Sequence, residues 1–234
     1  MTVDLDRESE YFQNYSGILC HDLKFELLSD GLIIHLHQAP DNIRYKHSYN
    51  ERQFFKRAQQ SSQALVKACN NKQRNIKTVL DLTGGWRMDS FILACHGQTV
   101  TSIEQNALVH KISAYSLGCA REIKPSAKAA SRIEIIHNDS VEYLQCHAES
   151  GAYDCIYLDP MFPDHKSSAK SAKSLQILQK LTLNQDIETC FELALQKAGK
   201  RVVVKRPAKS SPISDLGPDL VYREKTIRFD IYQT

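Results

Sequence analysis

The sequence predicts an α/β fold in which five parallel strands form an open sheet that an antiparallel hairpin closes. Short apolar runs alternate with helix-length segments from residue 78 to residue 205, and this order is typical of parallel strands joined by crossover helices. The order then changes, because the apolar runs at 220–223 and 227–232 are separated by only a few residues. Two strands joined so closely must pair antiparallel.

Each element follows from its own pattern of apolar residues. Two of the predicted helices are followed by glycine, Gly97 and Gly199, which is a common stop signal. The resulting plan is typical of Rossmann-like class I methyltransferases, whereas nicotinamide dehydrogenases continue with further parallel strands. The predicted strands span 78–82, 98–104, 132–137, 153–158 and 201–205, and the predicted helices span 89–96, 106–121, 140–146 and 186–198.

A small β-hairpin element is predicted before the main fold. Two alternating runs, 23–28 and 32–37, flank an Asp30-Gly31 turn, which allows the positive φ that tight hairpins need. Residues 42–57 are polar and basic, and we expect them to lead into one helix that caps the main domain. We therefore expect residues 1–50 to form an N-terminal tail and β-hairpin element, and residues 51–234 to form the Rossmann-like domain.

Composition excludes several classes of protein. With 234 residues and 42% hydrophobic content the chain can bury a full core. Its formal charge of +3 is too small to indicate a nucleic-acid partner by itself. The seven cysteines form no C-x-x-C pair, so we expect reduced thiols in the cytoplasm. Because no stretch of 18 apolar residues occurs, we expect no membrane span. His35 and His37 lack a nearby third ligand, so no metal site is expected.

The segment Asp159-Pro160-Met161-Phe162-Pro163 follows the predicted strand 153–158. Ligands of open α/β sheets bind outside the carboxyl ends of the strands. Both prolines fix φ and remove a backbone donor, so Asp159 and Phe162 are held in a stiff turn and directed at one small volume. An ordinary strand exit with a helix-capping aspartate is the alternative interpretation.

The loop after the first strand runs from Asp81 to Asp89. Its adjacent glycines, Gly84 and Gly85, permit a tight turn and a close approach of backbone to a ligand. The helix N-terminus that follows favours a carboxylate group. Because the G-x-G-x-x-G spacing is missing, a pyrophosphate cofactor is disfavoured. A purely structural glycine turn remains an alternative.

Acidic residues also stand at the ends of the next two predicted strands. Glu104 ends the second strand, where a carboxylate can accept both hydroxyls of a ribose, and Gln105 would pack beside it. After the third strand, Asp139 can accept a hydrogen bond from an adenine amino group or can cap the next helix. Together with Asp81, these acids outline a nucleoside pocket beside Asp159.

The rim of this pocket is predicted to be basic. A phosphate-backbone substrate would be positioned by such cations while the pocket reads one base. Solvated surface charge is the alternative interpretation. The candidate cations lie in a Ser/Ala-rich segment that we expect to have little order and at the end of the fifth strand; they are Lys166, Lys170, Lys173, Lys205 and Arg206.

Three blocks of the sequence, 159–163, 201–207 and 228–232, closely resemble the bacterial family of 16S ribosomal RNA guanine-N2 methyltransferases of the J type. The resemblance covers about residues 20 to 234 and implies a cytoplasmic enzyme that depends on S-adenosyl-L-methionine. Its implied partner is small-subunit ribosomal RNA or the 30S particle, in which one guanine is methylated on N2. The cofactor contacts that the resemblance implies fall on Met88, Asp89, Glu104, Gln105, Asp139, Ser140 and Asp159.

The implied chemistry is direct displacement without a metal. The guanine amino group must be held in line with the methyl group, with Asp159 or the Pro160 carbonyl accepting its hydrogens. Phe162 would stack on the base after it rotates out of its helix or loop. Two alternative functions remain. The unusual turn around Trp86 suggests a non-catalytic nucleoside- and RNA-binding ribosome-assembly factor, and the second alternative is a DNA amino-methyltransferase.

Overall fold

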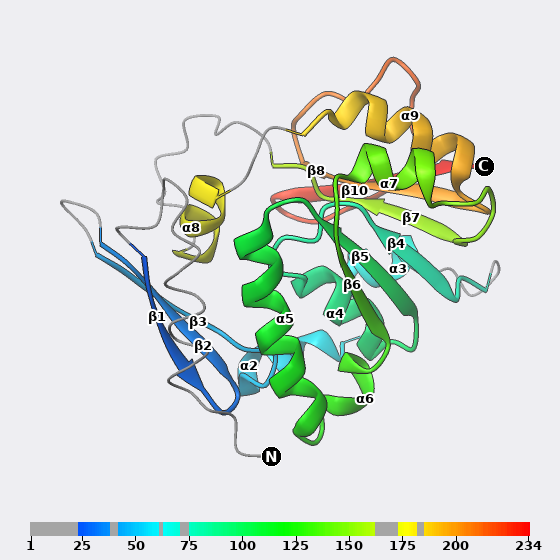
Figure 1. Ribbon diagram of the computed structural model, residues 1–234. Coiled ribbons are helices and arrows are strands. Elements are labelled where there is room, and N and C mark those ends of the chain that lie inside the picture. The colour runs from blue at the N-terminus through cyan, green and yellow to red at the C-terminus, as the bar shows by residue number, and fades with distance from the viewer. Residues whose placement is uncertain (1–22, 38–41, 61–62, 71–74, 162–172, 182–184) are drawn as a thin grey trace.

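The computed structural model describes residues 23–37, 42–60, 63–70, 75–161, 173–181 and 185–234. Phe162, Lys166 and Lys170, which the sequence marks as candidate site residues, lie outside the described residues. Where the chain is described, helices flank a central sheet and a second, smaller sheet lies to one side (Figure 1).

Seven described strands form the central sheet, in the order β6-β5-β4-β7-β8-β10-β9. Neighbouring strands from β6 to β8 are parallel, and β10 pairs antiparallel with both β8 and β9. The predicted α/β class, with five parallel strands and a closing hairpin, is confirmed. The strands are β4 (Thr78–Asp81), β5 (Thr99–Glu104), β6 (Ile133–His137), β7 (Cys155–Leu158), β8 (Arg201–Pro207), β9 (Leu220–Arg223) and β10 (Ile227–Gln233).

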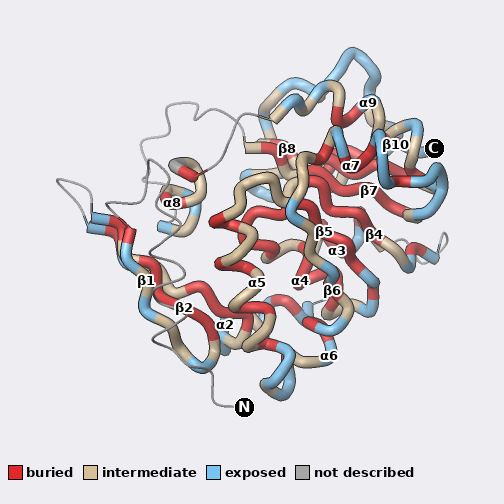
Figure 2. Tube along the Cα trace, in the orientation of Figure 1, coloured by how far each residue is buried: buried red, intermediate tan, exposed pale blue. Residues whose placement is uncertain are grey.

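Helices cover both faces of this sheet because both faces of its strands are apolar. Val79 and Tyr157 pack toward the face of α4 (Met88–Cys95), α5 (Ala107–Glu122) and α6 (Ala127–Ala130). Leu80 and Ile156 pack toward α7 (Ser140–Cys146) and α9 (Ile187–Lys197) on the other face. Figure 2 shows β4, β5, β7 and β8 as mostly buried. Because β4 to β8 of this sheet run parallel, their carboxyl ends lie at the same edge.

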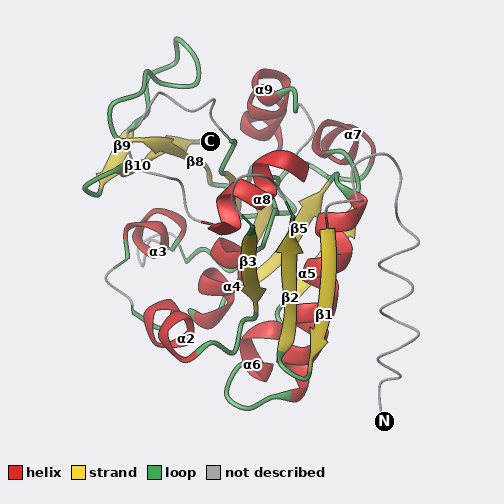
Figure 3. Ribbon diagram, turned by 90° about the vertical axis from the view of Figure 1, so that its left-hand side faces the viewer, coloured by secondary structure: helices red, strands yellow, loops and turns green. Residues whose placement is uncertain are grey.

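The N-terminal element is a sheet of three described strands, β1 (Leu23–Leu28), β2 (Gly31–Leu36) and β3 (Ile43–His47). The predicted hairpin is confirmed, but β3 lies in the polar and basic segment 42–57, for which no strand was expected. Its alternating charges, Arg44 and Lys46, concealed a strand whose other face packs inward through Ile43. The strands lie side by side in Figure 3, and the sheet shares an apolar cluster with α5.

Two further expectations about helices were wrong. The single helix expected after residue 50 is two short helices, α2 (Arg52–Ala58) and α3 (Ala64–Cys69). The Ser/Ala-rich segment that contains Lys173 was expected to have little order, but α8 (Lys173–Leu181) begins at that lysine. Helix α8 is held by tertiary packing, because Ile177 and Leu181 are buried in the apolar cluster of the small sheet and α5.

Candidate functional site

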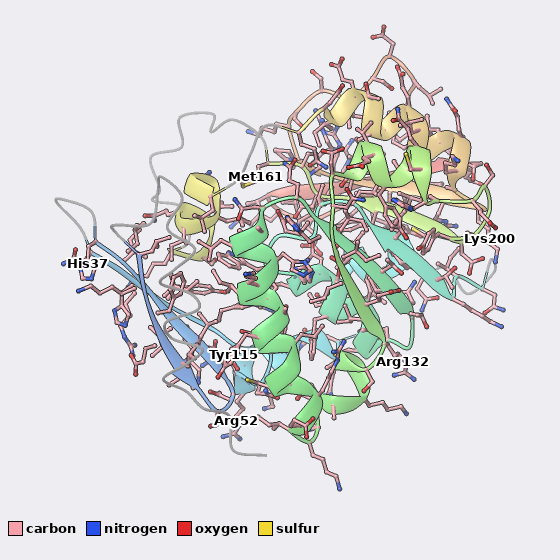
Figure 4. All side chains as sticks on the ribbon, viewed as in Figure 1. His37, Arg52, Tyr115, Arg132, Met161 and Lys200 are labelled. Atoms are coloured by element: carbon pink, nitrogen blue, oxygen red, sulfur yellow. The ribbon has the colours of Figure 1, made fainter. Side chains whose placement is uncertain are left out.

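A pocket of about 440 Å³ lies at the carboxyl ends of the parallel strands, a size that suits a small-molecule ligand. In Figure 4, Met161 marks this edge of the sheet, whereas Arg132 and Lys200, which precede β6 and β8, lie at the far edge. Most of the candidate residues line the pocket; they are Asp81, Gly84, Gly85, Met88, Asp89, Glu104, Gln105, Ser140, Asp159, Pro160 and Lys205.

The glycine turn after β4 is packed tightly against β5. The backbone N–H of Gly84 donates to the Ile103 carbonyl oxygen at 2.8 Å, and a Cβ on Gly84 would lie 2.7 Å from that oxygen. Gly85 adopts a φ of 48° and Arg87 a φ of 54°, both in the left-handed region. Arg87 bears the larger strain there, and its side chain is buried beneath the turn, 3.2 Å from Nδ1 of His110.

Glu104 clamps this turn to the start of α5. Its Oε2 accepts a hydrogen bond from the Gly85 N–H at 2.7 Å, and its Oε1 accepts one from the Asn106 N–H at 2.7 Å. Each carboxylate oxygen can accept more than one hydrogen bond, so the same group has acceptor capacity left for hydroxyls of a ligand. The carboxylate is preorganised by the backbone that it holds.

Asp81 is a buried acid in the lining of the pocket. Its Oδ1 accepts a hydrogen bond from the Thr83 N–H at 3.0 Å, and its Oδ2 accepts one from Ser90 Oγ at 2.5 Å. Burial raises its pKa to about 6, despite these hydrogen bonds. The acid therefore shapes the turn from below.

Asp139 caps α7, the structural role that the sequence left as one of two alternatives. Its Oδ1 accepts hydrogen bonds from the backbone N–H groups of Val141 at 2.8 Å and Glu142 at 3.0 Å. Asp139 is not among the residues that line the pocket, but Ser140 is, and its hydroxyl donates to the Leu82 carbonyl at 2.5 Å. A contact between Asp139 and an adenine amino group stays a prediction.

The centre of the pocket is a charged cluster around Lys205. Its Nζ donates to Oδ2 of Asp89 and to Oδ2 of Asp159, both at 2.8 Å. The Tyr157 hydroxyl donates to the same oxygen of Asp89 at 2.6 Å, and Thr83 Oγ1 accepts from the Asp159 N–H at 2.6 Å. Asp159, the acid that the sequence placed at the reacting point, is thus fixed by both its side chain and its backbone.

The two carboxylates of this cluster have opposite pKa shifts. Burial opposes ionisation of Asp89, but the Lys205 ammonium and hydrogen bonds from Lys205 and Tyr157 outweigh it and lower its pKa. At Asp159, burial and the nearby Asp89 charge raise the pKa, and Lys205 only partly offsets them. The Asp159 side chain keeps 37% of its surface exposed, so it is the carboxylate that faces an incoming ligand.

The predicted basic residues do not gather on one described surface. Lys205 faces the pocket, and Arg206 is buried with its guanidinium donating to the Ser211 carbonyl at 2.5 Å. Lys173 is exposed at the start of α8. Lys166 and Lys170 lie outside the described part of the chain, so the RNA-backbone contacts of this group stay predictions.

The sequence interpretation missed the wall that α8 contributes to the pocket. Leu175, Leu178 and Gln179 line it, and Trp86 Nε1 donates to the Ser174 carbonyl at 2.9 Å. Apolar residues at helical spacing in this segment were the available signal. The sequence carried no comparable signal for Tyr157, because a buried tyrosine in a strand is ordinarily a core residue.

The lining of the pocket is negatively charged. Among its described residues are four carboxylates, those of Asp81, Asp89, Glu104 and Asp159, against two cations. The excess of carboxylates in the lining suits a ligand with a positively charged centre.

No described helix is both long and apolar enough to cross a membrane. Within the described ranges, no three His, Cys, Asp or Glu side chains gather as a metal site.

Comparisons with known proteins agree with this geometry. A sequence model of the family described as "Putative SAM-dependent methyltransferase" matches residues 22–234. A protein named Ribosomal RNA small subunit methyltransferase J from Coxiella burnetii (strain Dugway 5J108-111) is 37% identical over 172 residues, which are 73% of this chain and 66% of the relative. The match therefore spans just under two thirds of that relative's length. A protein of the same name from Francisella philomiragia is 30% identical over 211 residues, covering 88% of this chain and 86% of the relative.

A solved structure shares the fold. The crystal structure of a SAM-dependent methyltransferase from Neisseria gonorrhoeae superimposes with a TM-score of 0.70 and covers 97% of this chain and 91% of its own. The two sequences are 23% identical, so this likeness concerns the fold alone.

Proposed function

The chain belongs to the family of SAM-dependent methyltransferases, and we propose that it methylates the exocyclic N2 of a guanine in small-subunit ribosomal RNA. The family match over residues 22–234 supports the use of S-adenosylmethionine. The names of the Coxiella and Francisella relatives support ribosomal RNA as the substrate. The choice of guanine N2 rests on the resemblance carried by segments 159–163, 201–207 and 228–232.

The residues of the pocket fit S-adenosylmethionine. The net negative lining suits its sulfonium, and the turn ahead of α4 offers backbone N–H groups at a helix N-terminus. Glu104 would accept the ribose hydroxyls, with Gln105 beside it. The remaining contacts would come from the end of β4 and the glycine turn after it, from the first turn of α4, from the start of α7 and from the residue after β7; these residues are Asp81, Gly84, Gly85, Met88, Asp89, Asp139, Ser140 and Asp159.

S-adenosylmethionine, when bound, supplies an electrophilic methyl group. The protein must then orient the target amino group, whose lone pair is delocalised into the base. The Asp159 carboxylate, fixed at its backbone by Thr83 and at its side chain by Lys205, accepts a hydrogen bond from this amino group and takes up the proton that the methylated nitrogen loses. The Pro160 carbonyl is the second acceptor. A preorganised acceptor of this kind stabilises the charge that develops during attack.

The same proposal includes contacts to the rest of the RNA. Phe162 would stack on the flipped base, and Lys166, Lys170 and exposed Lys173 would bind phosphates.

We also propose that residues 1–50 form an element appended to a methyltransferase domain of residues 51–234. The packing of its sheet beside α5 and Trp86 supports a role in shaping the pocket.

The observation that carries the proposal is the fixed position of Asp159 at the exposed side of a negatively charged pocket. Purified protein should transfer a labelled methyl group from S-adenosylmethionine to small-subunit RNA, with the 30S particle, single-stranded DNA and duplex DNA as competing acceptors. Asp159→Asn should lower the rate at saturating cofactor by roughly a hundredfold or more, while RNA affinity stays close to that of the wild type.

Asp215→Asn is a matched control, because Asp215 is exposed and does not line the pocket. Wild-type rates in Asp159→Asn would remove its catalytic role. Methylation of DNA in preference to RNA would identify a DNA amino-methyltransferase. Tight RNA binding without any transfer would identify a non-catalytic assembly factor.

A further inference from the structure

Lys205 stands where the two carboxylates of the pocket meet. Strands β7 and β8 are parallel neighbours with Leu158 paired to Val204, so Asp159, the residue just beyond β7, lies beside Lys205, which is still within β8. Asp89 reaches the same point from the first turn of α4. The Lys205 side chain is 22% exposed and bonds to both carboxylates at 2.8 Å, whereas a lysine that holds an RNA backbone needs its ammonium free to reach solvent.

The Lys205 ammonium offsets the repulsion between the Asp89 and Asp159 carboxylates. Two carboxylates that share one hydrogen-bonding partner repel each other, and a poorly hydrated charge is costly unless it is paired. Tyr157 adds a hydrogen bond to Asp89 but brings no positive charge. Arg87, the other cation of the described lining, lies on the His110 side of the glycine turn, where its guanidinium contacts the Gly85 carbonyl oxygen and Nδ1 of His110.

We propose that Lys205 is a positioning residue for methyl transfer, whose ammonium fixes Asp159 against Asp89 and sets the net charge that the pocket presents to its ligands. The inference rests on the proposed function, in which Asp159 receives the target amino group. It assigns Lys205 to the pocket instead of to the RNA backbone.

One consequence concerns ligand charge. S-adenosylmethionine carries a positive sulfonium, whereas its demethylated product, S-adenosylhomocysteine, has a neutral sulfur. Removal of the Lys205 charge makes the pocket more negative, so it should favour the sulfonium over the thioether. We expect the ratio of the two affinities to shift toward S-adenosylmethionine by about tenfold, the order of one charge interaction in a partly exposed site.

A second consequence concerns pH. The groups that face Asp159 are Asp89 from α4, Tyr157 from its own strand and Lys205 from β8, and of these Lys205 alone holds its pKa down. Without Lys205 the carboxyl stays protonated to a higher pH, and a protonated carboxyl cannot take up the amino proton. The acidic limb of the methylation rate should therefore move to higher pH by roughly one unit.

The experiment compares Lys205→Gln and Lys205→Arg with the wild type and with Lys209→Gln, a control at an exposed lysine beyond the same strand. Calorimetry with S-adenosylmethionine and S-adenosylhomocysteine measures the affinity ratio without RNA, and RNA methylation across pH locates the acidic limb. We expect Lys205→Gln to change both, Lys205→Arg to retain the wild-type ratio because it keeps the charge, and Lys209→Gln to change neither.

The proposal would be overturned if Lys205→Gln changed neither the ratio of the two ligand affinities nor the position of the acidic limb of the pH–rate profile. It would also be overturned if Lys205→Gln lowered the slope of the salt dependence of RNA binding by about one unit while both ligand affinities stayed the same. If Lys205→Gln fails to fold, a large change of the ratio in Lys205→Arg overturns it equally. If the wild type methylates no RNA, the proposed function fails, while the calorimetric ratio still tests Lys205.

Discussion

Replacement of Gly84 by alanine tests how tightly the glycine turn is packed. The added Cβ would lie 2.7 Å from the Ile103 carbonyl oxygen and 2.7 Å from Ser102 Oγ. The oxygen belongs to the backbone of β5 and already accepts the Gly84 N–H, so it cannot turn away, and the loop must shift by several tenths of an ångström. Overpacking of this kind costs about 1–3 kcal/mol.

That cost should lower the midpoint of thermal unfolding by roughly 2–12 °C for a chain of this size. Calorimetry should also show weaker binding of S-adenosylmethionine, because the shift moves Gly85 away from Glu104. Gly118→Ala is the matched control: Gly118 lies within α5 with nothing near its added Cβ, so alanine there should stabilise by about 0.5–1 kcal/mol. Wild-type stability and cofactor affinity in Gly84→Ala would refute the reasoning.

Three further substitutions test the neighbouring residues. In Glu104→Gln one side-chain oxygen still accepts a hydrogen bond from the Gly85 or the Asn106 N–H group, but the other oxygen is replaced by an amide nitrogen, which cannot accept. The free energy of cofactor binding should therefore weaken by about 1–3 kcal/mol; an unchanged cofactor affinity in calorimetry would remove the ribose role of Glu104. The Asp81 carboxyl has a pKa of about 6 in the fold against 3.8 ordinarily, so the folded state binds the extra proton and the free energy of unfolding falls as pH rises from about 4 to 6. Asp81→Asn should remove roughly 1–3 kcal/mol of this decline, as urea unfolding at both ends of the range would measure, and a decline of wild-type size would contradict it. Lys173→Ala should flatten the salt dependence of RNA binding by about one unit of slope with cofactor affinity unchanged, and an unaltered slope would leave it as solvated charge.

Local patterns were sufficient to predict the main fold. The apolar runs of the parallel strands are buried on both faces, so their sequences carry a strong signal. The same runs place Asp81, Glu104 and Asp159 at strand ends, because parallel strands share one carboxyl edge. The sequence also indicated the tight turn at Gly84, since its two adjacent glycines have few other uses at that position.

The parts that the sequence did not predict depend on contacts distant along the chain. Strand β3 is short and charged on one face, and it is stabilised by its pairing with β2. Helix α8 depends on the apolar cluster beneath it. Lys205 looks like part of a basic exit from β8 until the order of the strands places it between Asp89 and Asp159. A charge pattern in the sequence cannot distinguish these two environments.

The proposed reaction is methylation of N2 of a guanine in small-subunit ribosomal RNA. The most direct measurement is mass spectrometry of that RNA after incubation with the protein and S-adenosylmethionine, with fragments compared against an incubation with Asp159→Asn. We expect one guanosine-containing fragment heavier by a single methyl group, located on N2, in the wild-type sample alone. Identical fragment masses in the two samples, or a methyl group on any other base, would contradict it.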